Sequence, residues 1–166
     1  MIFRDIPVGA SVFLDANVLV YHFIAHSTFG PSSTELLDRI ERKALVGFVS
    51  SHVLGELSHR LMTLEATVLF GWPAQGIIRR LKRHPAEVGQ LTRSAQALDK
   101  LNLIGVTVLP VEGQQVSRAA DVSKQFGLLT NDALIIAIMR DHQSSHLASN
   151  DADFDRVSGL LRYAPL

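Results

Sequence analysis

The sequence of 166 residues contains no cysteine. This absence excludes a disulfide scaffold, a zinc ribbon, a thiolate nucleophile and an iron–sulfur site. Charged residues are also few, at 19% of the chain, and 16 acidic residues balance 16 basic ones, so the formal net charge is zero. No field of the whole protein therefore attracts nucleic acid or an anionic membrane, and a polyanion has to be held by local charges.

Long hydrophobic runs are lacking too. The longest apolar run, Ala133–Met139, is far shorter than the about 20 residues that a membrane-spanning helix needs. Asp5 and Pro7 lie where a signal peptide would carry an uninterrupted apolar stretch. We therefore expect a soluble, unprocessed cytoplasmic protein without membrane contact.

Hydrophobic residues make up 47% of the chain, enough for a large core, and the length fits one domain. Short apolar runs alternate with segments of helical periodicity, which is typical of an α/β fold with a mainly parallel sheet and helices on both faces. The expected strands are residues 11–14, 46–50, 106–109, 146–149 and 162–164, and the expected helices are residues 16–25, 31–44, 51–64, 73–82, 85–102, 113–125 and 131–142.

The segment of about residues 67–103 departs from this alternation, because two helical stretches follow one another there without a strand between them. Pro73 and Pro85 interrupt the helical pattern, since the residue before a proline disfavours the helical region. We expect a helical insertion or hairpin within a single domain spanning residues 1–166.

Acidic residues follow several expected strands. Parallel strands place their carboxyl ends along one edge of the sheet, and ligands bind outside that edge. Carboxylates packed together repel one another and resist desolvation, so such a cluster is stable near neutral pH only with a cation between them. Oxygen ligands without cysteine favour Mg²⁺ or Mn²⁺ over zinc. The acids that can reach this edge are Asp15, Glu56, Asp132, Asp151 and Asp153.

Each acid has a simpler explanation when it is taken alone. Asp15 and Asp132 stand where helices begin, and carboxylates are favoured at that position. Glu56 can pair with Arg60 one helical turn later. A phosphatase with two acids after its first strand is disfavoured, because the second position holds Asn17, which cannot donate and recover a proton.

Four short motifs carry the acids: FLDANVL at 13–19, SSHVLGEL at 50–57, TNDALI at 130–135 and SNDADF at 149–154. In this order and spacing, over nearly the whole chain, they resemble the PIN domain, and within it the VapC-type toxin ribonucleases of type II toxin–antitoxin systems. The resemblance implies a PIN-like three-layer α/β/α sandwich. It also implies an endoribonuclease that hydrolyses RNA phosphodiester bonds with one or two Mg²⁺ or Mn²⁺ ions and leaves a 5′-phosphate and a 3′-hydroxyl.

The resemblance assigns roles to individual side chains. Asn17 and Ser149 support the acids. The catalytic acids it implies are Asp15, Glu56, Asp132 and Asp151, and the metal ligands are Asp15, Asp132, Asp151 and the auxiliary Asp153.

A toxin of this kind implies a cognate antitoxin that masks the cleft, often with a basic side chain, and a homodimer. The apolar residues Leu64, Val68, Leu69 and Phe70 are a candidate docking surface, or they fill the core beneath the insertion. Separately, a basic cluster can bind RNA phosphates or can be an ordinary solvated helix face. The cluster consists of Arg79, Arg80, Lys82 and Arg83, next to His84.

Two other functions remain open. A PIN-like fold can be a binding or scaffold module without turnover, because a fold does not fix a function. A housekeeping RNA-processing nuclease would carry the same acids and have no antitoxin. Histidine pairs, His22 with His26 and His52 with His59, offer zinc or iron ligands, but the sequence has no His-Glu-x-x-His motif and surface histidines are the better interpretation.

Overall fold

A computed structural model describes residues 1–166. Its centre is a five-stranded sheet with the strand order β3-β2-β1-β4-β5, and every strand pairing is parallel. The expectation of a mainly parallel sheet is confirmed, and the sheet contains no antiparallel strand. The strands are β1 (Ser11–Leu14), β2 (Val46–Ser50), β3 (Thr107–Leu109), β4 (His146–Ala148) and β5 (Leu161–Tyr163).

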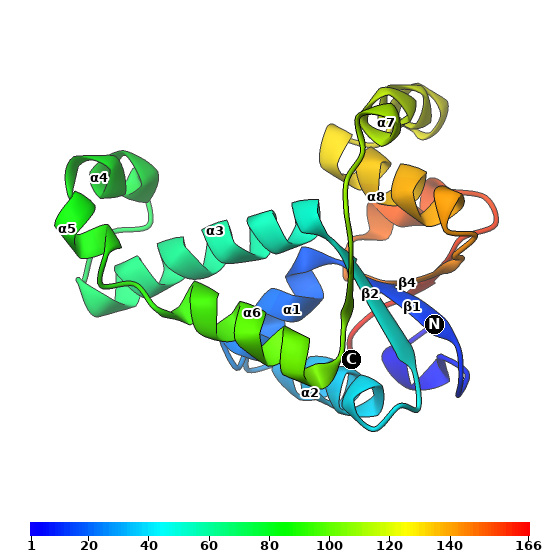
Figure 1. Ribbon diagram of the computed structural model, residues 1–166, viewed down its shortest axis with the longest axis horizontal. Coiled ribbons are helices and arrows are strands. Elements are labelled where there is room, and N and C mark those ends of the chain that lie inside the picture. Colours follow the sequence, from blue (N-terminus) through cyan, green and yellow to red (C-terminus); the bar gives the residue numbers. More distant parts are fainter.

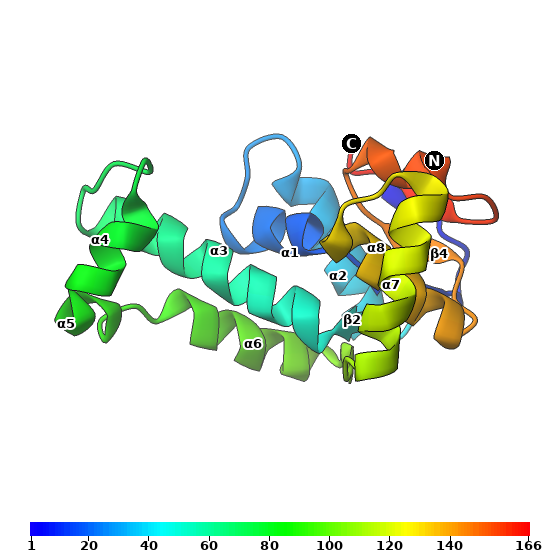
Figure 2. The same cartoon turned by 90° about the horizontal axis from the view of Figure 1, so that it is seen from above.

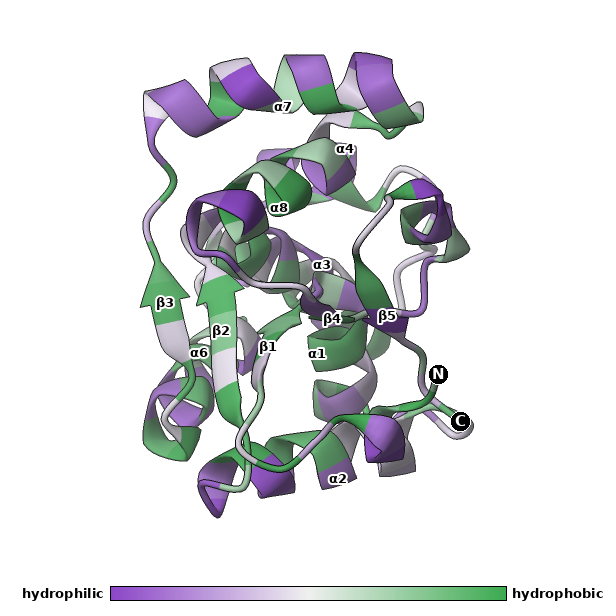
Figure 3. Cartoon of the chain, turned by 90° about the vertical axis from the view of Figure 1, so that its right-hand side faces the viewer, coloured by the Kyte–Doolittle hydropathy of each residue, from purple (hydrophilic) through white to green (hydrophobic).

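Eight α-helices and two short 3₁₀ helices surround the sheet. In Figure 3 the strands lie between the α7–α8 pair on one side and α2 on the other, which gives the three layers of an α/β/α sandwich. None of the helices combines the length and the apolar character needed to cross a bilayer. The helices are η1 (Phe3–Asp5), α1 (Ala16–Phe23), α2 (Gly30–Glu41), α3 (Ser51–Leu69), α4 (Ile77–Arg83), α5 (Pro85–Val88), α6 (Arg93–Ile104), α7 (Gly113–Phe126), α8 (Thr130–Asp141) and η2 (Ala152–Arg156).

The central strand β1 is covered on both faces. Its residues Val12, Phe13 and Leu14 are all buried, although successive side chains of a strand point to opposite faces. In α8, every residue from Ala133 to Met139 is buried. The longest apolar run of the sequence is therefore a core helix of the sandwich.

The strand register fixes which chain segments meet at the carboxyl edge of the sheet. Leu14 at the end of β1 pairs with Ala148 at the end of β4, and the amide of Asp15 donates to the Ala148 carbonyl at 3.1 Å. Ser50 at the end of β2 pairs with Leu109 in β3. The residues that follow β1, β2 and β4 therefore emerge side by side.

A long helical arm extends from one end of the molecule (Figures 1 and 2). The helix expected over residues 51–64 continues to Leu69, because a second small core of Ala66, Ile77 and Leu81 covers its far end. The helix expected at residues 73–82 begins only at Ile77, after Gly76 with a left-handed φ of 76°. The chain then returns along α3 as α6, which also contributes to the main core.

The single helix expected over residues 85–102 is two helices, α5 and α6. Glu65 explains where α6 begins. Its carboxylate is buried and accepts hydrogen bonds from the backbone amides of Thr92 (3.1 and 3.2 Å) and Arg93 (3.0 Å). A carboxylate from α3 thus satisfies two of the amides that a helix leaves unpaired at its start.

Removing this carboxylate is expected to destabilise the arm. Hydrogen bonds to a charged group contribute about 1.5–3 kcal/mol, so Glu65→Ala should lower the free energy of unfolding by roughly that amount. Chemical denaturation followed by circular dichroism measures it, with Glu87→Ala on α5, a helix without buried residues, as the matched control. A Glu65→Ala protein as stable as the control would show that the carboxylate does not hold α6.

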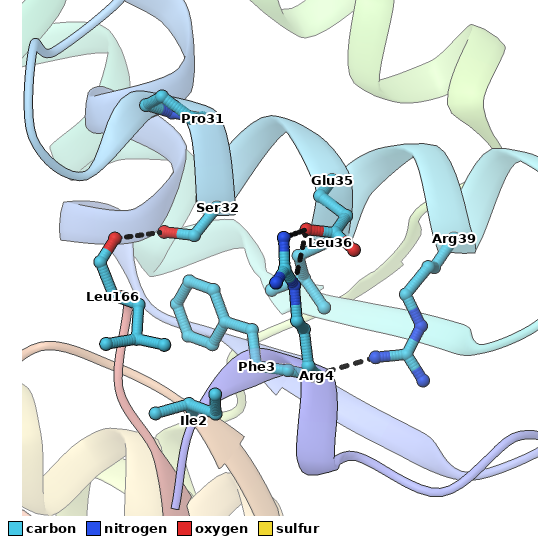
Figure 4. Close-up of a pocket in the computed structure, with 9 residues that line it drawn as sticks. All are labelled: Ile2, Phe3, Arg4, Pro31, Ser32, Glu35, Leu36, Arg39 and Leu166. Carbon is cyan, nitrogen blue, oxygen red and sulfur yellow. Dashed lines mark hydrogen bonds and ion pairs between the residues drawn. The ribbon is translucent and has the colours of Figure 1, made fainter.

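The two chain ends are fastened to α2. Figure 4 shows a cavity there, lined by Phe3, Leu36 and Leu166 among others. The Arg39 guanidinium donates to the Phe3 carbonyl at 2.7 Å, and Ser32 Oγ donates to the Leu166 carbonyl at 3.2 Å. These contacts are structural, because they bind the chain's own backbone.

Candidate active site

Asp15 lies directly after β1 and precedes α1. Its side chain makes no capping hydrogen bond to α1, so helix capping does not account for it. Instead, Oδ2 accepts two side-chain hydrogen bonds, from Ser149 Oγ at 2.6 Å and from Asn17 Nδ2 at 2.5 Å. Both donors bind the same oxygen, and they fix the orientation of a carboxylate that is only 8% exposed.

Ser149 is fully buried and connects three elements of the site. Its hydroxyl donates to Asp15 and accepts from Asn17 Nδ2 (3.3 Å) and from the Asp151 amide (3.0 Å). A hydroxyl has one donor and two acceptor positions, and all are used. The residues expected to support the acids, Asn17 and Ser149, therefore do contact Asp15.

Asp151 and Asp153 lie at the start of η2, after β4. Asp151 Oδ1 accepts the Asp153 amide at 2.8 Å, which holds the turn. Asp153 Oδ1 pairs with Arg156 at 2.7 Å, and Arg156 also donates to the carbonyl of Gly127 at 3.1 Å. The same arginine thus ties the auxiliary acid to the segment that leads into α8.

Asp132 and Glu56 come from helices on either side of the sheet. Asp132 lies in the first turn of α8 and is half-buried. Glu56 lies in α3 and forms the i,i+4 pair with Arg60, at 3.7 Å. A partly exposed pair of this kind contributes only about 0.3–0.5 kcal/mol, so Glu56 can exchange Arg60 for another partner at little cost.

The negative charges of these acids act on one another. Burial raises the pKa of Asp15 to about 6, and the negative charges of Glu56 and Asp132 add to this, while the Ser149 hydrogen bond opposes it. Burial also raises the pKa of Asp132 to about 6, with further contributions from Asp151, Glu56 and Asp153. Each of the five acids thus either has a raised pKa or raises that of a neighbour.

The acids do not form a closed cage. No three acidic or histidine side chains stand close enough together to surround a single ion. Of the two histidine pairs, His22 and His26 are occupied elsewhere, since His22 Nδ1 lies 2.9 Å from Thr34 Oγ1 and His26 Nδ1 accepts the amide of Phe29 at 3.2 Å. His52 Nε2 is buried and has no hydrogen-bond partner. The basic cluster of α4 lies at the far end of α3, away from this edge (Figure 1).

Two further residues belong to the site. The Asn150 amide donates to Asn17 Oδ1 at 3.2 Å, and Asn150 Nδ2 donates to Tyr21 Oη at 3.1 Å. Arg162 in β5 donates to the Ser149 carbonyl at 3.2 Å. Asn150 stands between two predicted site residues, but its contact with α1 depends on the register of β1 with β4, which the sequence does not show.

Of the apolar residues considered for docking, Leu64, Val68 and Leu69 are exposed. Phe70 is instead packed against the small core of the arm, where its ring lies 4.8 Å from that of Trp72. The arm therefore presents three of these four side chains to solvent.

Comparison with known proteins gives the family. The PIN domain matches residues 12–160. Among curated proteins, ribonuclease VapC2 of Methanocaldococcus jannaschii is 26% identical over 153 residues, which cover 90% of each chain. Ribonuclease VapC6 of the same organism is 23% identical over 151 residues, covering 89% of this chain and 93% of its own.

Solved structures show the same fold. VapBC2 of Rickettsia felis, bound to a DNA fragment from its promoter, has a TM-score of 0.61 at 17% identity and covers 94% of this chain and 99% of its own. VapC20 of Mycobacterium tuberculosis, a toxin that cleaves the sarcin–ricin loop, has a TM-score of 0.60 at 18% identity, covering 87% and 92%. With a family match over most of its length, this chain is a member of the PIN domain family.

Proposed function

We propose that this protein is a divalent-metal-dependent endoribonuclease and the toxin of a toxin–antitoxin pair. The observation that carries the proposal is Asp15, a buried carboxylate with a pKa near 6 beside Glu56 and Asp132. A buried group of like charges is unfavourable for folding and is typical of a site that binds a cation or transfers protons. The two related ribonucleases named above support RNA as the substrate.

The donor set fits Mg²⁺ or Mn²⁺. All candidate ligands are carboxylate oxygens, which hard divalent cations prefer, and Mg²⁺ keeps several waters, so it does not need a closed cage of side chains. Because no three of the acids stand close enough to surround one ion, Asp15, Asp132 and Asp151 would hold it partly through its water molecules, with Asp153 as the auxiliary ligand. The metal would activate a water and offset charge on the phosphodiester.

The remaining side chains orient and assist these acids. Ser149 and Asn17 hold Asp15 through Oδ2 and leave Oδ1 without a side-chain hydrogen bond. Glu56 lies at the rim with only a weak pair, and its carboxylate can accept the proton of the attacking water. Arg156 fixes Asp153 and keeps the turn after β4 beside α8.

An antitoxin is part of the proposal. Structures similar to this chain include the VapBC2 assembly and a toxin–antitoxin complex from Klebsiella pneumoniae, which has a TM-score of 0.54 at 15% identity and covers 90% of this chain and 95% of its own. A basic side chain of the antitoxin would neutralise the acidic edge in place of the metal. We propose a homodimer as the working assembly.

The test is cleavage of end-labelled single-stranded RNA by the purified protein with Mg²⁺, with Mn²⁺ and with EDTA. We expect cutting with either metal, none with EDTA, and products that end in a 5′-phosphate and a 3′-hydroxyl. Equal cutting in EDTA would refute metal dependence. Folded protein that cuts no RNA under any condition would favour the binding-module alternative.

A further inference from the structure

The basic cluster of α4 forms part of a hollow with an unusual lining. The hollow, which we name the arginine cup, has a volume of about 390 Å³. It is lined by Trp72, Gln75, Gly76, Arg79, Arg80, Arg83 and His84. Its lining contains no acidic side chain. Lys82, which the sequence places in the same cluster, is exposed but does not line the cup.

The three arginines carry charge that nothing on the protein offsets. None of them forms an ion pair, whereas five of the nine other arginines do, with Glu35, Glu56, Asp141, Asp153 and Asp155. Arg79 and Arg83 are four residues apart on one helix, and Arg80 and Arg83 are three apart, so their side chains share one face and repel. An anion bound between them would remove this repulsion.

The cup is also rigid enough to act as a site. Ile77 and Leu81, on the other face of α4, are buried against Ala66 of α3. Trp72 lies under the Arg80 guanidinium, whose central carbon is 5.5 Å from the ring centroid. His84 Nδ1 lies 2.8 Å from the Arg80 carbonyl, and because a carbonyl only accepts, this nitrogen carries the hydrogen.

The combination of guanidinium groups and aromatic rings fits a nucleic acid better than an acidic polypeptide. Guanidinium groups bind phosphate oxygens in pairs, and bases stack on aromatic rings and on guanidinium planes. The Arg80–Trp72 stack offers such a plane, and Arg79 and Arg83 stand beside it. A carboxylate chain would use the charges but not the stacking surface.

We infer that the arginine cup is a second RNA-binding site, remote from the acids, that holds the phosphates of the strand whose other part is cleaved. The inference rests on the proposed function. The cup and the acidic edge lie at opposite ends of α3 in both views (Figures 1 and 2). From Glu56 to the last residue of α3, Leu69, the helix rises by about 20 Å at about 1.5 Å per residue.

Because of this separation, the length of an RNA determines whether it can occupy both sites at once. Phosphates along one stacked strand advance by about 3.4 Å each, so a strand that reaches both sites has roughly six or more nucleotides when stacked. RNA of about 20 nucleotides can occupy the acids and the cup together, whereas RNA of about four nucleotides cannot. The cup should therefore favour long over short RNA.

The first experiment measures binding without cleavage. Asp15→Asn protein in EDTA is titrated with labelled single-stranded RNA of about 20 nucleotides, and Arg79→Gln/Arg83→Gln is added in the same background. We expect the affinity to fall roughly tenfold and the slope of log affinity against log salt to become shallower by about 1.4, at about 0.7 per lost phosphate contact. The chain has one tryptophan, Trp72, so its fluorescence should change as RNA fills the cup.

The matched control is Arg42→Gln/Lys43→Gln, which removes the same charge from exposed positions that form no ion pair and that precede β2 at the amino edge of the sheet. It should bind the long RNA within about twofold of the parent. In the metal-activated enzyme, the ratio of kcat/KM for long RNA to that for short RNA should fall in the cup variant and not in the control.

Two results would overturn the inference. One is equal affinity and an equal salt slope in the cup variant and the control. The other is a Trp72 fluorescence change with poly-glutamate but not with RNA, which would assign the cup to an acidic polypeptide. If the protein still cleaves RNA with metal when either result is found, the proposed nuclease function stands and only the cup inference fails. If RNA binds in the cup but no RNA is cleaved, the proposed nuclease function fails and the cup inference stands.

Discussion

We expect the Asp15→Asn variant to lose RNA cleavage, with kcat/KM falling by about 10²–10⁴-fold, because a bound metal ion contributes several kcal/mol of transition-state stabilisation and each 1.36 kcal/mol is tenfold in rate. Asparagine keeps the size of the side chain and one oxygen for Ser149, but it removes the negative charge that a cation needs. Asp132→Asn should show a loss of the same order, because the pKa of Asp132 is also raised to about 6 and Glu56 is a charged neighbour of both acids.

The matched control is Asp99→Asn, an acid exposed on α6 with no ion pair. Its kcat/KM should equal that of the parent, since it lies outside the acidic edge. Steady-state cleavage of one labelled RNA, with circular dichroism to establish folding, compares the three variants. Full activity in folded Asp15→Asn would remove Asp15 from the catalytic site.

The second large effect is on the stability of the metal-free protein. The pKa of Asp15 rises from 3.8 to about 6 on folding, so the folded state binds more protons than the unfolded state between these values. The stabilisation of the folded state by protonated Asp15 is therefore complete below about pH 4. It is lost as the pH rises through about 6. At 1.36 kcal/mol per pKa unit, the loss is roughly 2–3 kcal/mol for this nearly buried group.

Asp15→Asn should lack this loss, so in EDTA above pH 7 it should unfold at a higher temperature than the parent. Below pH 4 the two proteins should be nearly equal. Thermal unfolding at several pH values measures the difference, which isolates Asp15 from other titrating groups. Mg²⁺ should then raise the unfolding temperature of the parent but not of the variant, because a ligand of the folded state stabilises it. A parent more stable than the variant in EDTA at pH 8 would contradict the account.

Much of the fold is visible in the sequence because its signals are local. The run Ser11–Leu14 ending at Asp15 predicts a buried strand followed by a helix, and both are present. The apolar run of α8 and the strand Val46–Ser50 were equally clear. Since parallel strands end at one edge of a sheet, the sequence predicts that the candidate acids lie on that edge.

Contacts between distant segments were not predictable. The helical periodicity of apolar residues predicts that α3 ends near Leu64. The helix continues because residues 77–93 fold back and bury Glu65 and Ala66, and such contacts between distant segments leave no periodic signal. The bonds from Ser149 and Asn150 to the residues after β1 depend on strand register. In the sequence, the arginine cup is only a run of basic residues. Its unpaired charges and the contact of Arg80 with the Trp72 ring come from tertiary packing.

The most direct test of the central claim is a Mn²⁺ titration followed by the electron paramagnetic resonance of the free ion, with RNA cleavage measured in the same samples. The account predicts saturable binding of one or two ions to the parent, with cleavage rising in step, and the loss of both in Asp15→Asn. Cleavage that proceeds without bound metal, or Mn²⁺ binding and cleavage that survive in Asp15→Asn, would contradict it.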